Sequence, residues 1–169
     1  TLATRAEKEG YTTYMMTPDK DFGQAVTDKI LMFKPARGGN PPEIMGPEEV
    51  CEKFGLDRTE QIIDYLGLMG DKVDNIPGVP GVGAKTASKL LKQYGSMDGI
   101  YENVSEITGK LGEKIANNKD QAYLSKHLAT IITDVPVEFS EKNLTREDPN
   151  KEQINQLFTE LEFRTLSKR

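Results

Sequence analysis

The segment of residues 70–83 constrains the fold more than any other part of the chain. It holds four glycines and two prolines within 14 residues, so neither a helix nor a strand runs through it unbroken. Apolar residues recur with helical spacing on both sides of it, in residues 62–69 and in residues 84–94. The pattern predicts two helices joined by a tight hairpin.

The chain upstream of residue 47 has a different pattern. Short apolar runs typical of strands alternate there with short helical segments, which is the rhythm of an α/β layer. We expect the outer strand of this layer to expose an edge. Residues 34–46 are rich in Gly and Pro and predict a loop. The predicted elements are helices at residues 1–9 and 21–26 and strands at residues 11–16 and 30–33.

Downstream of residue 47 the periodicity predicts only helices. The capping-box-like pair Asp57 and Glu60 indicates the start of one of them. The clearest is the last, which has Asp148 as its expected cap and Pro149 in its first turn. Its apolar residues recur at i, i+3, i+4 and i+7, namely Ile154, Leu157, Phe158 and Leu161. The predicted helices cover residues 47–54, 57–69, 84–94, 96–103, 110–117, 120–131 and 149–162.

These patterns predict an α/β fold made of two parts. Residues 1–46 form a truncated α/β layer, and residues 47–169 form a mostly helical subdomain that contains the helix–hairpin–helix element. The chain begins at Thr1 with neither an initiator Met nor a helix-capping partner upstream. We therefore expect it to be a fragment of a longer protein.

Composition limits the chemistry. The only cysteine, Cys51, and the only histidine, His127, lie 76 positions apart, which argues against a Cys/His zinc site. Any metal should therefore be held by oxygen ligands, as Mg²⁺ or Mn²⁺ is. The net charge of −5 argues against a generic nucleic-acid-binding surface. No apolar run approaches the ~18 residues of a membrane helix, and we expect a cytosolic protein without a membrane partner.

Two short acidic clusters are candidate sites. Asp19 and Asp21 follow a predicted strand, where ligands of open α/β sheets bind. The alternative is that Asp simply favours turns and helix N-termini. Asp71 and Asp74 are spaced i, i+3 and face the same side of a helical turn, where they repel each other unless a cation or a proton intervenes. Neither cluster has the Gly and Glu positions of an EF-hand loop.

The hairpin that follows imitates a phosphate-binding P-loop. Ala84 displaces its lysine by one position and no strand precedes it, so the NTPase interpretation is rejected. A hairpin whose glycines let backbone N–H groups approach a phosphate fits better. Lys85, Lys89 and Lys92 recur on the expected solvated side of the next helix, opposite a predicted apolar stripe of Ala84, Ala87, Leu90, Leu91 and Tyr94. Such lysines either form an ordinary solvated face or bind phosphates.

Two strings of residues resemble one known family. They are residues 19–26, Asp-Lys-Asp-Phe-Gly-Gln-Ala-Val, and residues 70–87, which include Asp-x-x-Asp-Asn-Ile-Pro-Gly-Val-x-Gly-x-Gly. Both closely resemble the 5′→3′ exonuclease domains of the flap endonuclease family, which bacterial DNA polymerase I carries. The similarity extends from residue 1 to about residue 169. The resemblance implies a PIN-like, resolvase-like α/β layer and a helix–hairpin–helix element of the H3TH type.

The resemblance also implies the site residues. Asp19, Asp21, Asp71 and Asp74 would be catalytic carboxylates that hold two Mg²⁺ or Mn²⁺ ions. The resemblance also implies a monovalent cation such as K⁺, which would bind the carbonyl groups of Val79 and Val82. The residues that would grip duplex DNA by its phosphates are Gly78, Gly81, Val82, Gly83, Lys85, Thr86 and Lys89.

The implied function is metal-dependent hydrolysis of phosphodiesters in 5′-flap or nicked duplex DNA during replication and repair. The implied partners are this DNA and the remainder of a polymerase chain, in the bacterial cytoplasm near the nucleoid, with no small organic cofactor. Family members have further acids upstream of the resembling region, so we expect an incomplete metal site and negligible activity of the chain alone. Two alternatives remain, a non-catalytic duplex-DNA-binding module and an unrelated Asp-x-Asp enzyme acting on phosphate esters.

Overall fold

The computed structural model describes residues 1–36, 38–163, 165 and 166. The chain divides into two compact units, Thr1–Val137 and Glu138–Arg169. This division differs from the predicted boundary at residues 46 and 47, which follows the change from sheet to helices and stays a prediction. Within the described residues, no helix has both the length and the apolar character needed to cross a membrane.

The first unit begins with a small mixed sheet. Strands β1 and β2 are parallel, β3 pairs antiparallel with β2, and the order is β1-β2-β3. The outer strands β1 and β3 each pair on one side only within the described chain, as expected for exposed edges. The elements of this layer are α1 (Leu2–Lys8), β1 (Thr13–Met16), the 3-10 helix η1 (Lys20–Ala25), β2 (Ile30–Lys34) and β3 (Glu43–Met45).

The loop predicted at residues 34–46 is wrong in part, because its end forms β3. Met45 lies opposite Met32 in the register, and each exposes only 1 % of its surface. Burial of these two side chains favours the third strand, whereas the Gly and Pro residues lie in the connection before it and at Gly46 after it. The element predicted at residues 21–26 is a 3-10 helix that starts one residue earlier.

The helical part of the first unit matches the prediction closely. Helices at residues 47–54 and 84–94 are confirmed at both ends, and Gly55 ends the first of them in the left-handed conformation, with φ of 65°. The 3-10 turn η2 (Val104–Glu106) was not expected. The helices are α2 (Pro47–Phe54), α3 (Gln61–Met69), α4 (Ala84–Tyr94), α5 (Met97–Glu102), α6 (Gly109–Asn117) and α7 (Lys119–Ala129).

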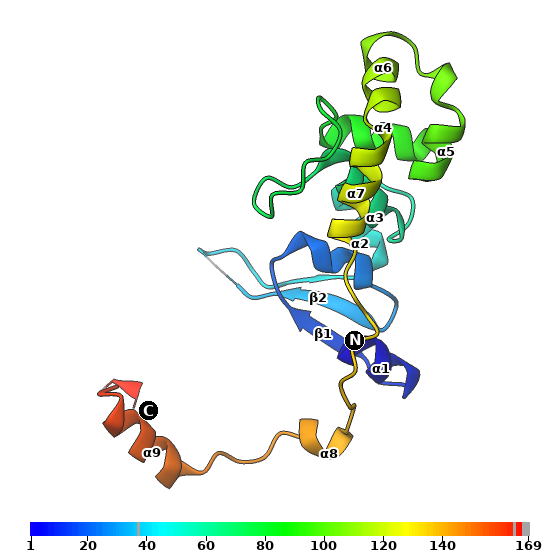
Figure 1. Ribbon diagram of the computed structural model, residues 1–169. Helices are drawn as coiled ribbons and strands as arrows, with labels where there is room; N and C mark the ends of the chain where they lie inside the picture. The colour runs from blue at the N-terminus through cyan, green and yellow to red at the C-terminus, as the bar shows by residue number, and fades with distance from the viewer. Residues whose placement is uncertain (37, 164, 167–169) are drawn as a thin grey trace. The chain divides into compact units, whose positions relative to one another are not determined.

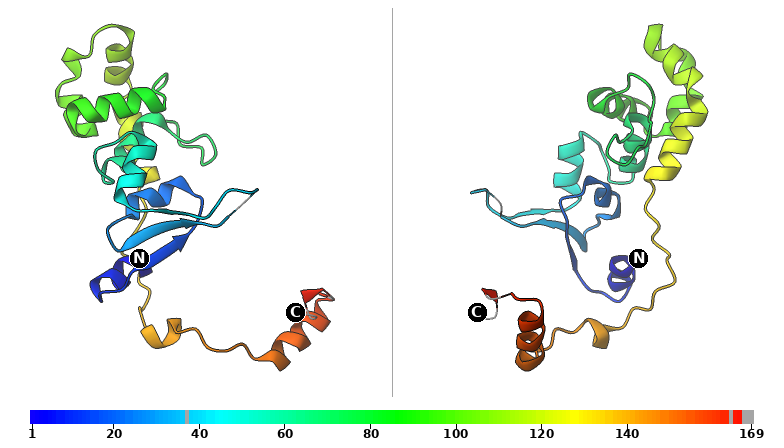
Figure 2. Two further views of the ribbon diagram at one scale, coloured as in Figure 1. Left: turned by 180° about the vertical axis from the view of Figure 1, so that it is seen from behind. Right: turned by 60° about the vertical axis from the view of Figure 1, so that its left-hand side comes forward.

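Helix α3 lies at the centre of this unit and packs against α7, α4 and η1. Seven of its nine residues are buried. Gly67 allows α7 to approach closely, because a Cβ atom there would lie 2.9 Å from the Cα atom of Lys126. Figures 1 and 2 show the sheet at one end of the unit and α6 at the other, with α3, α4 and α7 between them. Helix α3 therefore fixes the segments at both of its ends.

The capping box predicted from Asp57 and Glu60 is wrong. Helix α3 begins at Gln61, whose Oε1 accepts hydrogen bonds from the backbone N–H groups of Asp57 at 2.9 Å and Arg58 at 3.3 Å. Its Nε2 donates to the carbonyl oxygen of Gly95 at 2.9 Å. Gln61 is buried, so its amide satisfies backbone groups that a surface cap would otherwise serve.

The second unit contains α8 (Glu141–Leu144), which was not predicted, and α9 (Lys151–Glu160). The expected cap Asp148 is wrong, because the side chain of Asn150 accepts from the N–H of Gln153 instead and Pro149 precedes the helix. The apolar stripe of α9 is only partly covered, and Leu157 exposes 48 % of its surface.

Candidate functional site

The structure gathers carboxylates from two distant segments. Asp21 lies in η1, and Asp71 and Asp74 follow the end of α3, fifty residues later. One carboxylate oxygen from each of the three lies within 4.8 Å of the others. Asp71 is buried, Asp21 is partly buried and Asp74 is exposed. The arrangement has the size of a site for a hard cation.

Asp71 is held by a tight turn. Its backbone forms an antiparallel bridge with Ile76, with N–H···O distances of 2.8 and 2.7 Å. The N–H of Val73 donates to its Oδ1 at 2.8 Å. Asn75 adopts φ of 58°, a left-handed conformation that Asn tolerates better than most residues. This local network fixes the direction of the Asp71 carboxylate before any cation binds.

Two glycines let this turn cross the start of the hairpin. A Cβ atom on Gly78 would lie 2.4 Å from the backbone N of Gly70, and a Cβ atom on Gly70 would lie 2.6 Å from the carbonyl oxygen of Ile76. Both glycines also have positive φ, 62° and 74° respectively. Only glycine satisfies both conditions without displacement of the backbone. The acidic turn, residues 71–76, and the hairpin are therefore in direct backbone contact and depend on one another.

Asp19 lies outside this group. Its Oδ1 accepts from the backbone N–H of Asp21 at 3.1 Å, and it therefore caps η1. Its own N–H donates to Oγ1 of Thr17 at 3.1 Å. Thus the structure brings together three of the four expected carboxylates, and the role of Asp19 as a ligand stays a prediction.

Lys20 belongs to the acidic group, although it was not expected there. Its Nζ donates a hydrogen bond to Oδ2 of Asp71 and lies 3.4 Å from Oδ1 of Asp21. No sequence pattern indicates this contact, since a lysine between two acids normally points to solvent. The long stem of lysine reaches across from η1 to the end of α3 only because these elements pack together.

The pKa values of Asp21 and Asp71 are shifted in opposite directions. Burial raises the pKa of Asp21, and the neighbouring charges of Asp19 and Asp71 add to this effect against the opposing charge of Lys20. The hydrogen bond from Lys20 lowers the pKa of Asp71. Burial alone would lower the pKa of Lys20, but its interactions with Asp71 and Asp21 outweigh burial and raise it. The repulsion expected between crowded carboxylates contributes to the raised pKa of Asp21, but burial is its larger cause.

The donor set fits a divalent cation that prefers oxygen. All three converging groups are carboxylates, and Oδ1 of Asp21 is buried without a hydrogen-bond partner among the described residues. A buried carboxylate oxygen of this kind is unfavourable unless a cation lies beside it, and in the described structure the ammonium group of Lys20 lies 3.4 Å away. Mg²⁺ and Mn²⁺ are the ions that match such ligands.

The hairpin of residues 78–83 joins the acidic turn to α4 and is fixed from two sides. The N–H of Val79 donates to the carbonyl oxygen of Leu68 at 2.8 Å, and the N–H of Val82 donates to Val79 at 3.0 Å. The N–H of Gly78 donates to Oγ of Ser125 at 3.0 Å, so α7 also supports the hairpin.

These bonds involve two of the residues predicted to contact phosphates, whose role in DNA binding stays a prediction. The amides of Gly78 and Val82 are already used inside the protein, and both residues are buried. Gly81 and Gly83 are exposed, and no hydrogen bond within the described residues occupies their amides. The carbonyl group of Val79 accepts from Val82, while a cation at Val79 and Val82 stays a prediction.

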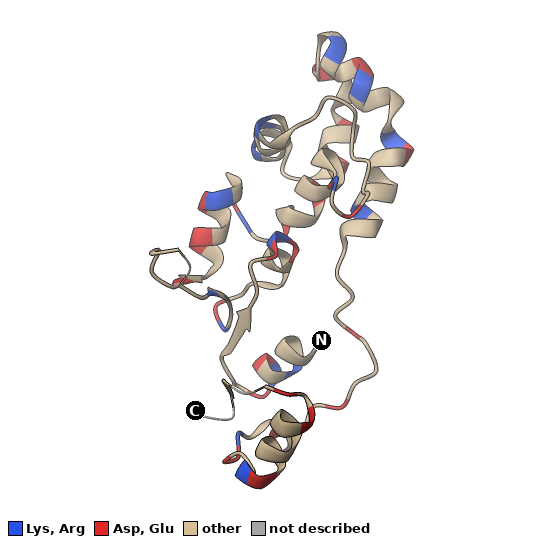
Figure 3. Cartoon of the chain, turned by 90° about the vertical axis from the view of Figure 1, so that its left-hand side faces the viewer, with Lys and Arg blue, Asp and Glu red and all other residues tan. Residues whose placement is uncertain are grey.

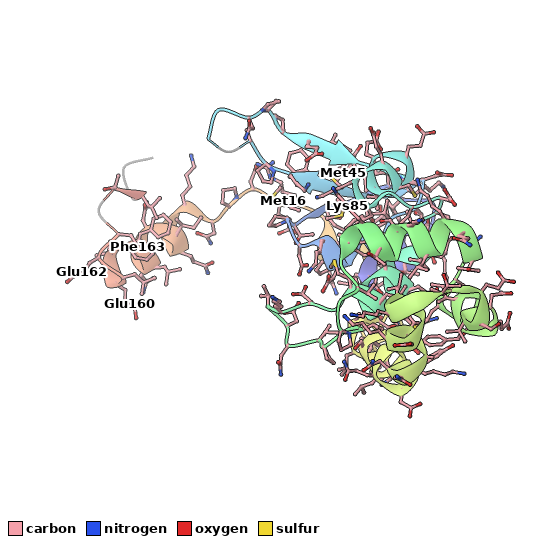
Figure 4. The ribbon with its side chains drawn as sticks, turned by 90° about the horizontal axis from the view of Figure 1, so that it is seen from above. Met16, Met45, Lys85, Glu160, Glu162 and Phe163 are labelled. Atoms are coloured by element: carbon pink, nitrogen blue, oxygen red, sulfur yellow. The ribbon has the colours of Figure 1, made fainter. Side chains whose placement is uncertain are left out.

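The first turn of α4 is open to solvent. Gly83 is its N-cap and offers no side chain to cap the turn. Lys85 and Lys89 are exposed and Thr86 is partly buried. Figure 4 places Lys85 at the start of α4, and Figure 3 shows basic residues along this helix, seen nearly end-on. In the predicted apolar stripe Ala87, Leu90 and Leu91 are buried and Tyr94 is partly buried, whereas Ala84 is exposed, which corrects that one position.

A further lysine lies against the hairpin. Lys114 of α6 places its Nζ only 2.5 Å from the position that a Cβ atom on Gly81 would take. The φ of 84° favours glycine at position 81, whereas the ammonium group ends a flexible side chain and can move aside. Sequence spacing does not indicate this residue, because the packing of the helices, and not local spacing, brings α6 to the hairpin.

Comparison with known proteins agrees with this geometry. The family described as "5'-3' exonuclease, C-terminal SAM fold" matches residues 58–152, more than half of the chain. This chain belongs to that family. It is 49% identical to DNA polymerase I of Bacillus subtilis over 170 residues, which cover all of this chain and 19% of that protein. The chain thus spans about a fifth of this relative's length.

Solved structures share the fold. The 5′-exonuclease of phage T5 with bound divalent metal ions (zinc) has a TM-score of 0.66 and 21% identity, covering 76% of this chain and 46% of that one. The bacteriophage T5 flap endonuclease in a pseudo-enzyme–product complex with DNA and metal ions gives the same values. The expected α/β fold with a helix–hairpin–helix element is therefore confirmed.

Proposed function

We propose that this chain forms part of a metal-dependent 5′→3′ exonuclease or flap endonuclease within a DNA polymerase I. It would act on phosphodiesters of 5′-flap or nicked duplex DNA in bacterial replication and repair, in the cytoplasm near the nucleoid. The convergence of Asp21, Asp71 and Asp74 beside a phosphate-accessible hairpin carries this proposal. Family membership supports it, and so do the metal ions and DNA bound by the T5 enzymes.

The residues of this chain divide the work between two places. Asp21, Asp71 and Asp74 would hold Mg²⁺ or Mn²⁺, with Asp19 as a further ligand that remains to be tested. Bound cations of this kind activate water and neutralise the leaving oxygen of a phosphodiester. The buried Asp71, fixed by the N–H of Val73, would keep its position throughout.

The hairpin would bind the duplex without reading its sequence. The amides of Gly81 and Gly83 lie at the N-terminal end of α4, where the helix dipole favours an anion. Lys85, Lys89 and Lys114 would neutralise phosphates, and Thr86 would add a hydroxyl group near them. Contacts of this kind position DNA but do not select bases. A K⁺ ion at the carbonyl groups of Val79 and Val82 would reinforce this hairpin.

Cleavage of a labelled 5′-flap duplex with Mg²⁺ tests the proposal. We expect a longer protein that carries this sequence to cleave the flap and this chain alone to show negligible cleavage, because positioning and charge neutralisation act together. Loss of cleavage in the long protein after Asp74→Asn supports the proposal. Unchanged cleavage contradicts it and favours a chain that only binds duplex DNA.

A further inference from the structure

We propose that Lys20 serves as a built-in cation of the acidic centre, which consists of Asp21, Asp71 and Asp74. Its ammonium group bridges Asp21 and Asp71 in the metal-free protein, and an entering divalent ion displaces it. This inference rests on the proposed metal centre and assigns a role to a residue that the chemistry of hydrolysis does not itself require. It explains how buried carboxylates stay together when no metal is bound.

The contacts of Lys20 are those of a bridging cation. Its Nζ is hydrogen-bonded to Oδ2 of Asp71 and lies 3.4 Å from Oδ1 of Asp21. The Asp71 and Asp21 side chains retain only 6% and 18% of their solvent exposure. Carboxylates that share little water repel one another strongly, and breaking such a buried pair by removal of the cation is destabilising. Lys20 therefore occupies the electrostatic position that a metal ion would take.

Groups other than the lysine hold the carboxylate of Asp71 and the backbone of Asp21. The N–H of Val73 holds Oδ1 of Asp71, and the capping bond to Asp19 holds the backbone of Asp21. The side chain of Lys20 keeps 35% of its exposure, and its flexible four-carbon stem leads to solvent. On metal binding, the ammonium group can leave while the ligands remain in place. The centre is thus preformed by a cation that is exchangeable.

Mn²⁺ binding to purified wild-type protein and two variants tests this exchange. Lys20→Met removes the charge and keeps most of the length of the side chain. Lys72→Met is the matched control, because Lys72 is an exposed lysine in the acidic turn with no ion pair in the described structure. Free Mn²⁺ is measured by electron paramagnetic resonance, and thermal unfolding is followed in chelator and in saturating Mn²⁺.

We expect Lys20→Met to bind Mn²⁺ about fivefold more tightly than wild type, as removal of one partly accessible competing charge predicts. The same variant should melt at a lower temperature in chelator and recover in Mn²⁺, whereas Lys72→Met changes neither measurement comparably. Equal or weaker Mn²⁺ binding by Lys20→Met overturns the inference but leaves the metal centre intact. Equal effects of both variants also overturn it. Absence of Mn²⁺ binding in every protein overturns the metal centre itself.

A measurement on the wild-type protein covers the case in which Lys20→Met does not fold. Brief acetylation followed by mass spectrometry compares the reactivity of Lys20 with that of Lys72, with and without Mg²⁺. Displacement predicts that Mg²⁺ raises the relative reactivity of Lys20 severalfold. Unchanged relative reactivity at saturating Mg²⁺ overturns the inference.

Discussion

The acidic centre and the hairpin are neighbours in the structure but are built on different principles. The centre collects Asp21, Lys20 and Asp71 from segments fifty residues apart and keeps them mostly out of water. The hairpin comes from one continuous segment, and its functional groups face solvent. The centre therefore depends on packing between η1 and α3, whereas the hairpin depends on backbone conformation. Substitutions in the two regions should therefore impair the protein in different ways.

Asp71→Asn should separate the two regions most strongly. The change keeps the shape of the side chain and its bond to Val73 but removes the charge that a cation needs. In an active longer protein we expect at least about a 100-fold loss of flap cleavage, the scale of losing one electrostatic contact to the transition state. Duplex binding by the hairpin should stay within about twofold. Asp28→Asn, at an exposed position, is the control, and equal losses in both variants would contradict the assignment.

Gly78→Ala should damage both regions at once, since their backbones cross there. A Cβ atom would lie 2.4 Å from the backbone of Gly70 at a positive φ. We expect about 3 kcal/mol of lost unfolding free energy, because backbone strain adds to a clash that cannot relax. Gly95 also has a positive φ, 81°, but open space around it. Gly95→Ala should therefore lose only about 1 kcal/mol of unfolding free energy. Urea denaturation measures both, and similar losses would show that the crossing is unimportant.

Substitution of the lysines at the hairpin should affect only its binding of duplex DNA. Lys85→Ala with Lys89→Ala should reduce the slope of log affinity against log salt by about two for duplex DNA, and Lys114→Ala should reduce it by about one. Stability should change little because Lys85 and Lys89 are exposed. Lys151→Ala in α9 serves as the control. Fluorescence anisotropy over a range of salt measures the slopes, and an unchanged slope in the double variant places the contact elsewhere.

The smallest effect should be the pH dependence contributed by Asp71. Its pKa in the folded protein is lowered from 3.8 by the hydrogen bond from Lys20. The unfolded state therefore binds the proton more tightly, so this carboxylate contributes stability above pH 3.8 that is lost as the pH falls through its folded pKa. The stability difference between wild type and Asp71→Asn should be constant from pH 5 to 7 and change in favour of the variant below pH 4. A constant difference down to pH 3 would contradict the ion pair.

Helices α4 and α9 show what the periodicity of apolar residues can and cannot predict. Both have apolar residues at helical spacing, and both form near the predicted positions. Leu91 of α4 is fully buried, but Leu157 of α9 exposes 48% of its surface. Local spacing favours a helix in each case because it depends on residues one turn apart. Whether a stripe is covered depends on a distant partner, and the sequence pattern contains no information on it.

The sequence by itself determined most of the helices, the glycine-dependent turns and the expectation of oxygen ligands at the candidate site. Each of these follows from residue type or from spacing within a few positions. Tertiary structure alone decided that β3 joins the sheet and that Lys20 and Lys114 reach the centre and the hairpin. The physical reason is that long side chains find partners across packed elements, and the distance between those elements depends on the whole core.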